Sequence, residues 1–361
     1  MKARILCCGD VGPLTLGDGA LSEPIAPFLK QADLRFAQCE RMYSMRGELA
    51  PNSNAVHARC SPEFAEVFFG CGFDVVSLAS NHTLNFGAEA LAETINLFRS
   101  RGVQIVGAGM NITEARMPAF VDVAGHRIAF LAYASVLRDG FAATEDSAGA
   151  APLRVRTWYE EFDWQPGMPP VVRSEVWEDD LEKMCADISA AKELADHVIV
   201  SQHWGIHYIP KLIAEYQPPA AKAAIAAGAD AIIGSHAHAP KAIEMIDGKP
   251  CFYSLGNFIM SGVPKNGDKA RLFEDQYGVK LDPSRPFLPY GQDACRLVIA
   301  ELNVSDAGIE AGVYLGEIGT DMKPRVFDSG PAFDEALNFL EFVSDGYGTV
   351  FRRSGAYVAV E

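Results

Sequence analysis

Basic residues are too few in this sequence for a general nucleic-acid binder. Its 361 residues carry 31 lysines and arginines against 47 aspartates and glutamates, which gives a formal net charge of -16. Nucleic-acid binding depends on basic side chains that displace phosphate counterions, and attachment to an anionic membrane surface needs the same charge. We therefore expect neither nucleic acid nor membrane among the partners. A few local cations can still reverse the field within one site, so an anionic substrate is not excluded.

Long apolar runs and paired cysteines are also missing. No run of about 18 apolar residues occurs, as a membrane-spanning helix would require. The first ten residues reach a Gly-Asp turn too early for a secretory signal peptide. The eight cysteines form no C-x-x-C pair, so we expect reduced core thiols rather than a disulfide framework or a structural zinc site. These absences predict a cytoplasmic protein, and the sequence does not indicate its oligomeric state.

Short β-rich segments alternate with amphipathic segments along most of the chain. Predicted strands include 3–9, 33–40, 74–80 and the segment 251–258, and predicted helices include 22–32, 61–72 and 87–102. Segments 295–304 and 311–318 are typical of antiparallel strands, and a helix is predicted at 331–348. The alternation predicts an α/β fold, which we interpret as a single domain over 1–361.

Two stretches interrupt this pattern, at 138–178 and 262–292. The first combines aromatic and acidic residues with the run PGMPP, and the second is rich in glycine, proline and lysine. Each is either a surface excursion or a lid over a cleft. We favour lid-like insertions, because long loops in compact domains often carry function.

Polar side chains able to bind metal ions follow several predicted strands at the point where each strand ends. They are Asp10, Glu40, Asn81, His82, His203, His236 and His238. Any one of them alone is better explained as a turn, cap or core residue. Ligand sites of α/β sheets assemble at the carboxyl ends of strands, so the whole set indicates one site.

The pair His236-x-His238 is the most informative part of this set. On an extended segment two residues two apart point the same way, so both imidazoles can reach adjacent metal ions. Carboxylate and amide oxygens mixed with imidazoles suit divalent manganese, iron or zinc. Two ions bridged by one carboxylate would activate a water molecule and clamp the reacting centre.

Three further residues are candidates for substrate binding. Arg41 and Arg46 lie close to Glu40 in the sequence, and a guanidinium binds carboxylate or phosphate. For Arg46 an ordinary surface position is the better interpretation. Asn257 follows another predicted strand and is expected to line the site.

The string GDVG…CE…SLASNHTLNFG…VSQHWG…AGADAIIGSHAHAP…FYSLGNF resembles the bacterial capsule-synthesis (CapA, poly-γ-glutamate) family over residues 3–260. That family is similar to the calcineurin-like metallophosphoesterases. The resemblance implies a four-layer α/β/β/α sandwich. It also implies that Asp10 and His238 bind a first metal ion and that Glu40 bridges both ions. The second ion would be bound by Asn81, His203 and His236, and His82 would be the general acid or a charge-stabilising donor.

Two positions depart from the related patterns. Phosphoesterases place a histidine two residues after the first aspartate, where this chain has Gly12, so one or two ions would bind. The capsule family commonly reads HWG-x-Glu-Tyr, whereas this chain has His207 before Tyr208. His207 is then a substrate-binding cation, a surrogate ligand or a residue supporting the ligands.

The resemblance implies a metal-dependent hydrolase in which metal-bound hydroxide attacks an amide bond, of γ-glutamyl type, in a small anionic substrate. A phosphoesterase is the alternative, and a non-catalytic accessory protein of capsule synthesis is the second alternative. The incomplete first metal site favours amide over phosphate ester chemistry, because phosphate cleavage profits most from two ions.

Overall fold

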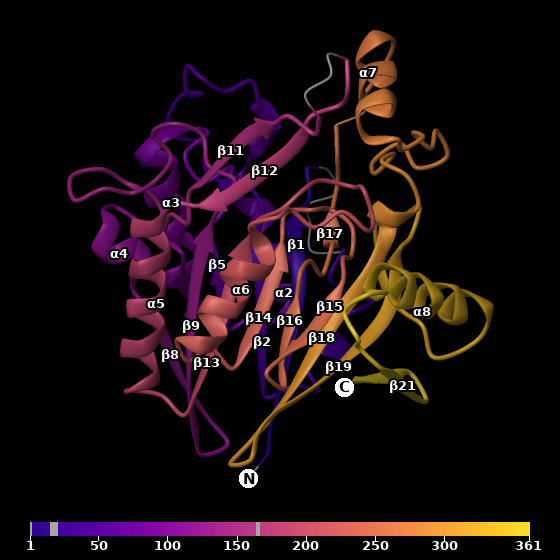
Figure 1. The fold of residues 1–361 in the computed structure, drawn as a ribbon. Coiled ribbons are helices and arrows are strands. Elements are labelled where there is room, and N and C mark those ends of the chain that lie inside the picture. The colour runs from indigo at the N-terminus through magenta and orange to yellow at the C-terminus, as the bar shows by residue number, and fades with distance from the viewer. Residues whose placement is uncertain (1, 15–20, 164–166, 264) are drawn as a thin grey trace.

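A computed structural model describes residues 2–14, 21–163, 167–263 and 265–361, and two stacked β-sheets form its centre (Figure 1). The larger sheet has the order β21-β22-β19-β18-β1-β2-β5-β6, with β17 also paired to β1 and β20 to β19. Its strands are β1 (Ala3–Gly12), β2 (Leu34–Cys39), β5 (Val75–Ser77), β6 (Gln104–Val106), β17 (Asn257–Met260), β18 (Arg296–Ser305), β19 (Gly308–Ile318), β20 (Pro324–Val326), β21 (Phe351–Ser354) and β22 (Tyr357–Val360).

The smaller sheet has the order β15-β16-β14-β13-β9-β8. Its strands are β8 (Ala119–Val123), β9 (His126–Ala134), β13 (His197–His203), β14 (Ala231–Ser235), β15 (Ile243–Ile246) and β16 (Lys249–Phe252). Three short pairs stand outside both sheets: β3 (Met42–Tyr43) with β4 (Arg59–Cys60), β7 (Ala108–Gly109) with β10 (Gly149–Ala150), and β11 (Val155–Glu160) with β12 (Val171–Val176).

Helices α1 to α3 cover the outer face of the larger sheet and α5 and α6 that of the smaller sheet, whereas α8 packs into the core between the sheets. The α-helices are α1 (Ala26–Leu29), α2 (Glu66–Cys71), α3 (Gly87–Ser100), α4 (Ile112–Arg116), α5 (Glu178–Lys192), α6 (Gln217–Ala226), α7 (Asp268–Tyr277) and α8 (Pro331–Ser344). Three single 3-10 turns are η1 (Val56–Ala58), η2 (Pro62–Ala65) and η3 (Asp293–Cys295). No helix in the described ranges is long and apolar enough to cross a membrane.

Side-chain alternation along the strands produces the layers. In β1, Ile5 and Cys7 face the smaller sheet, where they share a core with Phe130 of β9, whereas Leu6 packs with helices α1 to α3. Phe36 of β2 stacks on Phe130 across the gap, with ring centroids 5.7 Å apart. The far face of the smaller sheet packs against α5 and α6. Successive residues of a strand point to opposite faces, so both sheets are buried on both sides. The predicted four-layer α/β/β/α order is confirmed.

Most predicted elements are present, and three differ in informative ways. The helix predicted at 87–102 is α3, and the antiparallel tail strands are β18 and β19. Only Ala26–Leu29 of the predicted helix 22–32 is helical, because prolines 24 and 27 lack N–H donors and restrict the preceding residues. Segment 61–72 divides into η2 and α2. Segment 251–258 divides between β16 and β17, which belong to different sheets, and Gly256 between them has a φ of +72°.

Both interrupting stretches contain regular structure. The first carries the β11–β12 hairpin, and the second carries α7. Residues 164–166 and 264, which fall within these stretches, lie outside the described residues. In Figure 1, α7 and the hairpin stand at the end of the molecule opposite the N-terminus. Strand β1 starts near the N-terminus and runs toward that opposite end.

Candidate metal centre

The predicted ligands come from strand ends of both sheets. Asp10 lies near the end of β1 and Glu40 follows β2, its parallel neighbour. His203 ends β13, and His236 follows the adjacent parallel strand β14. Parallel strands end at one edge of a sheet, so chain segments far apart in sequence meet there.

Gly9 allows the close approach that fixes Asp10. The Asp10 N–H donates to the carbonyl of Gly256, with 2.9 Å between nitrogen and oxygen. A Cβ at position 9 would lie 2.0 Å from that same oxygen. Only glycine permits this contact between β1 and the segment before β17.

Two buried carboxylates form the middle of the site. Asp10 is fully buried, and its Oδ2 accepts a hydrogen bond from the backbone N–H of His236 at 3.1 Å. Glu40 Oε2 accepts from Ser80 Oγ at 3.2 Å. One ligand atom each of Asp10, Glu40 and His203 fall within 4.8 Å of one another. Asp10 Oδ1 and Glu40 Oε1 are buried without any hydrogen-bond partner in the described structure.

The charges of this pair are strongly coupled. Burial and then the nearby charge of Glu40 raise the pKa of Asp10 to about 8. Burial also favours the protonated form of Glu40, but the imidazoles of His203, His238 and His82 outweigh it and lower the pKa of Glu40. Two buried carboxylates with oxygens within 4.8 Å of each other cannot both ionise without a compensating positive charge.

His203, Asn81 and His236 form a connected group on one side of Glu40. His203 Nε2 lies 2.8 Å from Asn81 Oδ1 and 3.1 Å from His236 Nδ1. The same Nε2 lies 3.5 Å from Glu40 Oε2. His203 Nδ1 contacts Ser235 Oγ at 3.0 Å, which fixes the orientation of the ring. Burial lowers the pKa of His203 to about 4 and lowers that of His236 as well, so both rings are neutral.

His238 approaches the other oxygen of Glu40. Its Nε2 lies 3.4 Å from Glu40 Oε1, and its Nδ1 lies 3.6 Å from Asp10 Oδ2. Burial lowers the pKa of His238, but the close approach and negative charge of Glu40 outweigh this effect and raise it. The segment is not extended as predicted, since His236 has a φ of +85° and His238 a φ of +55°. Left-handed backbone at two bulky residues is strained, and such strain is typical of functional sites.

His82 presents one nitrogen to the carboxylates. Its Nδ1 lies 2.9 Å from Asn85 Oδ1, which can only accept, so Nδ1 carries the proton and Nε2 points toward the site. Nε2 lies 3.6 Å from Glu40 Oε1. Burial lowers the pKa of His82, although Glu40 opposes this. The side chains of His82 and His238 are 12% and 14% exposed, against 0% for His203, so solvent reaches the site over these two rings.

The donor set fits a divalent transition metal. Two carboxylates, one amide oxygen and three imidazoles are the ligands that manganese, iron and zinc accept. Buried carboxylate oxygens without a partner are costly, and a cation is the partner that would satisfy them. The two oxygens of Glu40 face different histidines, as a bridging carboxylate requires.

Two predicted substrate-binding residues are engaged elsewhere, which corrects the prediction. Arg41 is buried, and its guanidinium donates to the carbonyls of Gly12 at 2.7 Å, His57 at 2.5 Å and Ser261 at 2.6 Å. A Cβ at Gly12 would lie 3.0 Å from Arg41 Nε, so the arginine occupies the space beside that glycine. Arg41 therefore ties three segments together and is not free to bind an anion.

Asn257 is likewise buried and fully used. Its Oδ1 lies 2.9 Å from His238 Nδ1, and its Nδ2 donates to the carbonyls of His238 and Ala294. This bonding holds the His238 ring in place. Asn257 is thus a positioning residue rather than the predicted substrate contact.

His207 and Tyr208 form an aromatic wall beside the histidines. The His207 ring centroid lies 4.0 Å from that of His236 and 5.3 Å from that of His238. Burial lowers the pKa of His207 to about 3, which favours a neutral ring and disfavours the predicted cationic role. His57, which no sequence pattern indicated, packs edge-on against His82 with centroids 5.7 Å apart. It lies on η1, away from any strand end, and the strand-end pattern could not have found it.

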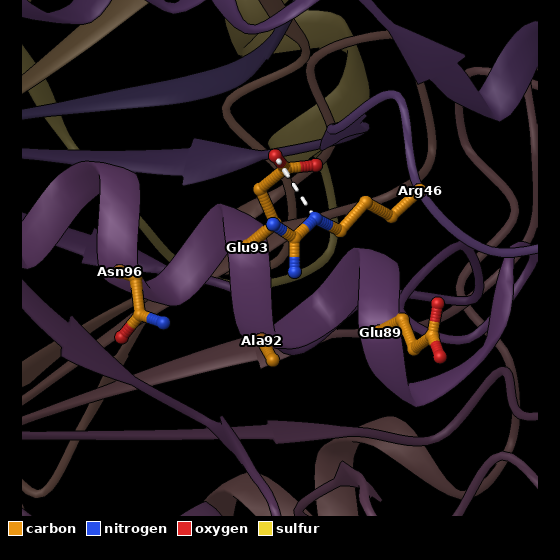
Figure 2. A pocket seen from close by; sticks show the side chains of 5 residues that line it. All are labelled: Arg46, Glu89, Ala92, Glu93 and Asn96. Carbon is orange, nitrogen blue, oxygen red and sulfur yellow. Dashed lines mark ion pairs between the residues drawn. The ribbon is translucent and has the colours of Figure 1, made fainter.

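Arg46 lies at the surface, away from the carboxylates of Asp10 and Glu40, as the surface interpretation predicted. Figure 2 shows it over a surface pocket on α3 that is lined by Arg46, Glu89, Ala92, Glu93 and Asn96. Its Nε lies 3.6 Å from Glu93 Oε1, and its side chain is 71% exposed. A pair this exposed contributes little to stability.

Sequence comparison relates the chain to proteins of capsule synthesis. The model of the family described as bacterial capsule synthesis protein PGA_cap matches residues 17–261. The chain is 28% identical over 275 residues to the PGA biosynthesis protein CapA of Bacillus subtilis, covering 75% of this chain and 64% of that protein. It is 29% identical over 227 residues to a probable polyglutamine synthesis accessory protein of Mycobacterium tuberculosis, covering 63% and 55%. The matches thus span about half to two thirds of these relatives.

Among solved structures, the chain is similar to the calcineurin-like phosphoesterase YfkN from Bacillus subtilis, with a TM-score of 0.43, 13% identity and coverage of 95% of this chain and 98% of that one. It is also similar to GAP50, the anchor in the inner membrane complex of Plasmodium, with a TM-score of 0.42, 13% identity and coverage of 95% of each chain.

Proposed function

The chain belongs to the bacterial capsule synthesis protein family PGA_cap, whose model matches residues 17–261, and from this premise we propose that it is a metal-dependent hydrolase. The bond cleaved is an amide, of γ-glutamyl type, in a small substrate that carries a carboxylate. The names of the relatives, which refer to PGA and polyglutamine, support a glutamate-derived substrate.

The observation that carries this proposal is the pair of buried carboxylates, Asp10 and Glu40, each with one oxygen that has no hydrogen-bond partner among the described groups. A purely structural core would replace them with apolar residues, because buried unpaired carboxylates destabilise the fold. Asp10, Glu40 and His238 would hold a first ion, and Glu40, Asn81, His203 and His236 a second.

The residues of this chain have distinct tasks in the proposed reaction. A bound divalent ion would polarise the scissile carbonyl and lower the pKa of a water molecule. His82 would move a proton at Nε2, the nitrogen that points into the site, while Asn85 holds Nδ1. The side chains of His82 and His238 are partly exposed, so the substrate would approach over their rings.

The proposal predicts that His82→Ala keeps its metal and loses turnover. Each variant would be loaded with manganese, iron or zinc, its metal content measured, and hydrolysis of γ-glutamyl-p-nitroanilide followed. General acid–base groups contribute about 10²–10⁴-fold, so a loss of that size is expected. The matched control is His197→Ala, because His197 lies at the start of β13, away from the carboxylates. Loss of metal from His82→Ala would instead make His82 a ligand.

Two alternatives to amide hydrolysis are a non-catalytic role in capsule synthesis and phosphoesterase activity. Relatives named as synthesis accessory proteins favour a non-catalytic role in capsule synthesis. A phosphoesterase would use the same ions on a phosphate ester. Parallel assays with p-nitrophenyl phosphate separate the two hydrolases, and a metal-loaded protein that cleaves neither substrate supports the accessory role.

A further inference from the structure

The second insertion, residues 262–292, packs aromatic side chains against Tyr208, which in turn stacks on His238 of the proposed metal-ligand cluster (Asp10, Glu40, Asn81, His203, His236 and His238). Tyr208 stacks on His238, with ring centroids 5.8 Å apart. Phe273 and Tyr277 of α7 contact the same tyrosine at 5.2 and 5.3 Å, and Tyr290 contacts it at 5.4 Å. The insertion is therefore docked beside the site by a continuous set of ring contacts, and residues that it carries lie near the substrate.

Lys265 is the cation that this insertion places over those rings. Its Nζ lies 5.2 Å from the ring centroid of Phe273 and 5.0 Å from that of Tyr290. The side chain is half-buried. Among the residues that the structure describes, none offers it a hydrogen bond or a carboxylate partner, whereas other half-buried lysines such as Lys192 pair with an aspartate. Burial, and then the charge of Lys269, lower its pKa.

Lys265 lies close enough to His57 for its charge to act on that ring. Burial, followed by the positive charges of Arg41, His82 and Lys265, lowers the pKa of His57 to about 4. His57 packs against His82, over which solvent reaches the carboxylates. The guanidinium of Arg41 is used by three backbone carbonyls, whereas Lys265 has no hydrogen-bond partner among the described residues.

We propose that Lys265 binds a carboxylate group of the substrate, held between the aromatic rings of the insertion and the metal cluster. A half-buried ammonium without a counter-ion is poorly solvated, and an anionic ligand would satisfy it. Only the choice of a carboxylate over another anion rests on the proposed function. The assignment gives the insertion a task in substrate specificity and replaces Arg41 as the anion-binding residue.

Calorimetric titration of the manganese-loaded protein with glutarate, its neutral analogue glutaramide and inorganic phosphate tests this assignment. Wild type should bind glutarate more tightly than glutaramide, and Lys265→Met should weaken glutarate binding about tenfold or more. Methionine packs well on aromatic rings, so the variant should keep its fold. Lys269→Met is the matched control, since Lys269 is exposed on α7, shortly after Lys265 in the same insertion, and the charge change is identical.

Three results would overturn the assignment: equal glutarate binding by wild type and Lys265→Met, equal losses in both lysine variants, or a dependence on Lys265 confined to phosphate. The test is separate from that of the hydrolase. If the protein cleaves no substrate but glutarate binding depends on Lys265, the anion site stands and the hydrolase fails. If turnover occurs and Lys265→Met binds glutarate as wild type does, the hydrolase stands and the anion site fails.

Discussion

At the scale of single residues, buried polar groups fall into two classes. Arg41 has a carbonyl oxygen within 2.7 Å of each of three guanidinium nitrogens, so it is satisfied by the protein alone. Asp10 and Glu40 each keep an oxygen with no partner. The first arrangement stabilises the fold, and the second would be stabilised by the cation that we propose binds there.

Arg41→Lys should therefore lower the free energy of unfolding by about 2–4 kcal/mol, because an ammonium cannot reach three carbonyls arranged for a guanidinium. Chemical denaturation measures this difference. Arg46→Lys is the control, since Arg46 is 71% exposed and should change stability by less than about 0.5 kcal/mol. Equal stability of the Arg41 variant and wild type would contradict the account of this residue.

At the scale of elements, the loops that follow the strands also have to be held in place for the site to form. Lys241 lies after β14 and is almost fully buried. Its ammonium donates to the carbonyls of Ile209 and Leu212 and so anchors the loop that carries His207 and Tyr208. Burial lowers the pKa of Lys241 to about 7. A depressed lysine pKa means that the unfolded chain binds the extra proton between about pH 7 and 10.5.

Stability should therefore rise with pH across that window relative to Lys241→Met. Linkage gives a slope of about 1.4 kcal/mol per pH unit for one such proton. The gain in the free energy of unfolding disappears as pH falls toward 7. Urea denaturation at pH 7, 8 and 9 measures the difference between the two proteins, in which other titrating groups cancel. Parallel curves for wild type and Lys241→Met would contradict the assigned pKa.

The strand-end rule also defines what sequence can predict. Asp10, Glu40, His203 and His236 could be placed together because each follows a buried strand whose apolar run is visible in the sequence. The left-handed backbone of His236 and His238 could not, because tertiary contacts impose it. Nor could the bonds of Arg41, which join residues up to 220 positions apart. His57 and Lys265 lie on irregular segments that carry no periodic pattern.

At the scale of the whole molecule, the two sheets bring the proposed metal ligands together. β1 and β2 of the larger sheet supply the carboxylates, and β13 and β14 of the smaller sheet supply imidazoles. The shared core between the sheets, with Phe36 stacked on Phe130, fixes their spacing. The insertion with α7 then packs further aromatic rings on Tyr208 and adds a cation, Lys265, at the same end.

The most direct test of the central claim is the metal content of the purified protein. Elemental analysis after exposure to manganese, iron or zinc should find one or two ions per chain in wild type. Glu40→Gln, which keeps the shape of the side chain but removes its charge, should lose most of them, whereas the surface variant Glu89→Gln should match wild type. A folded wild-type protein that retains no transition metal, or an equal metal content in Glu40→Gln, would contradict the account.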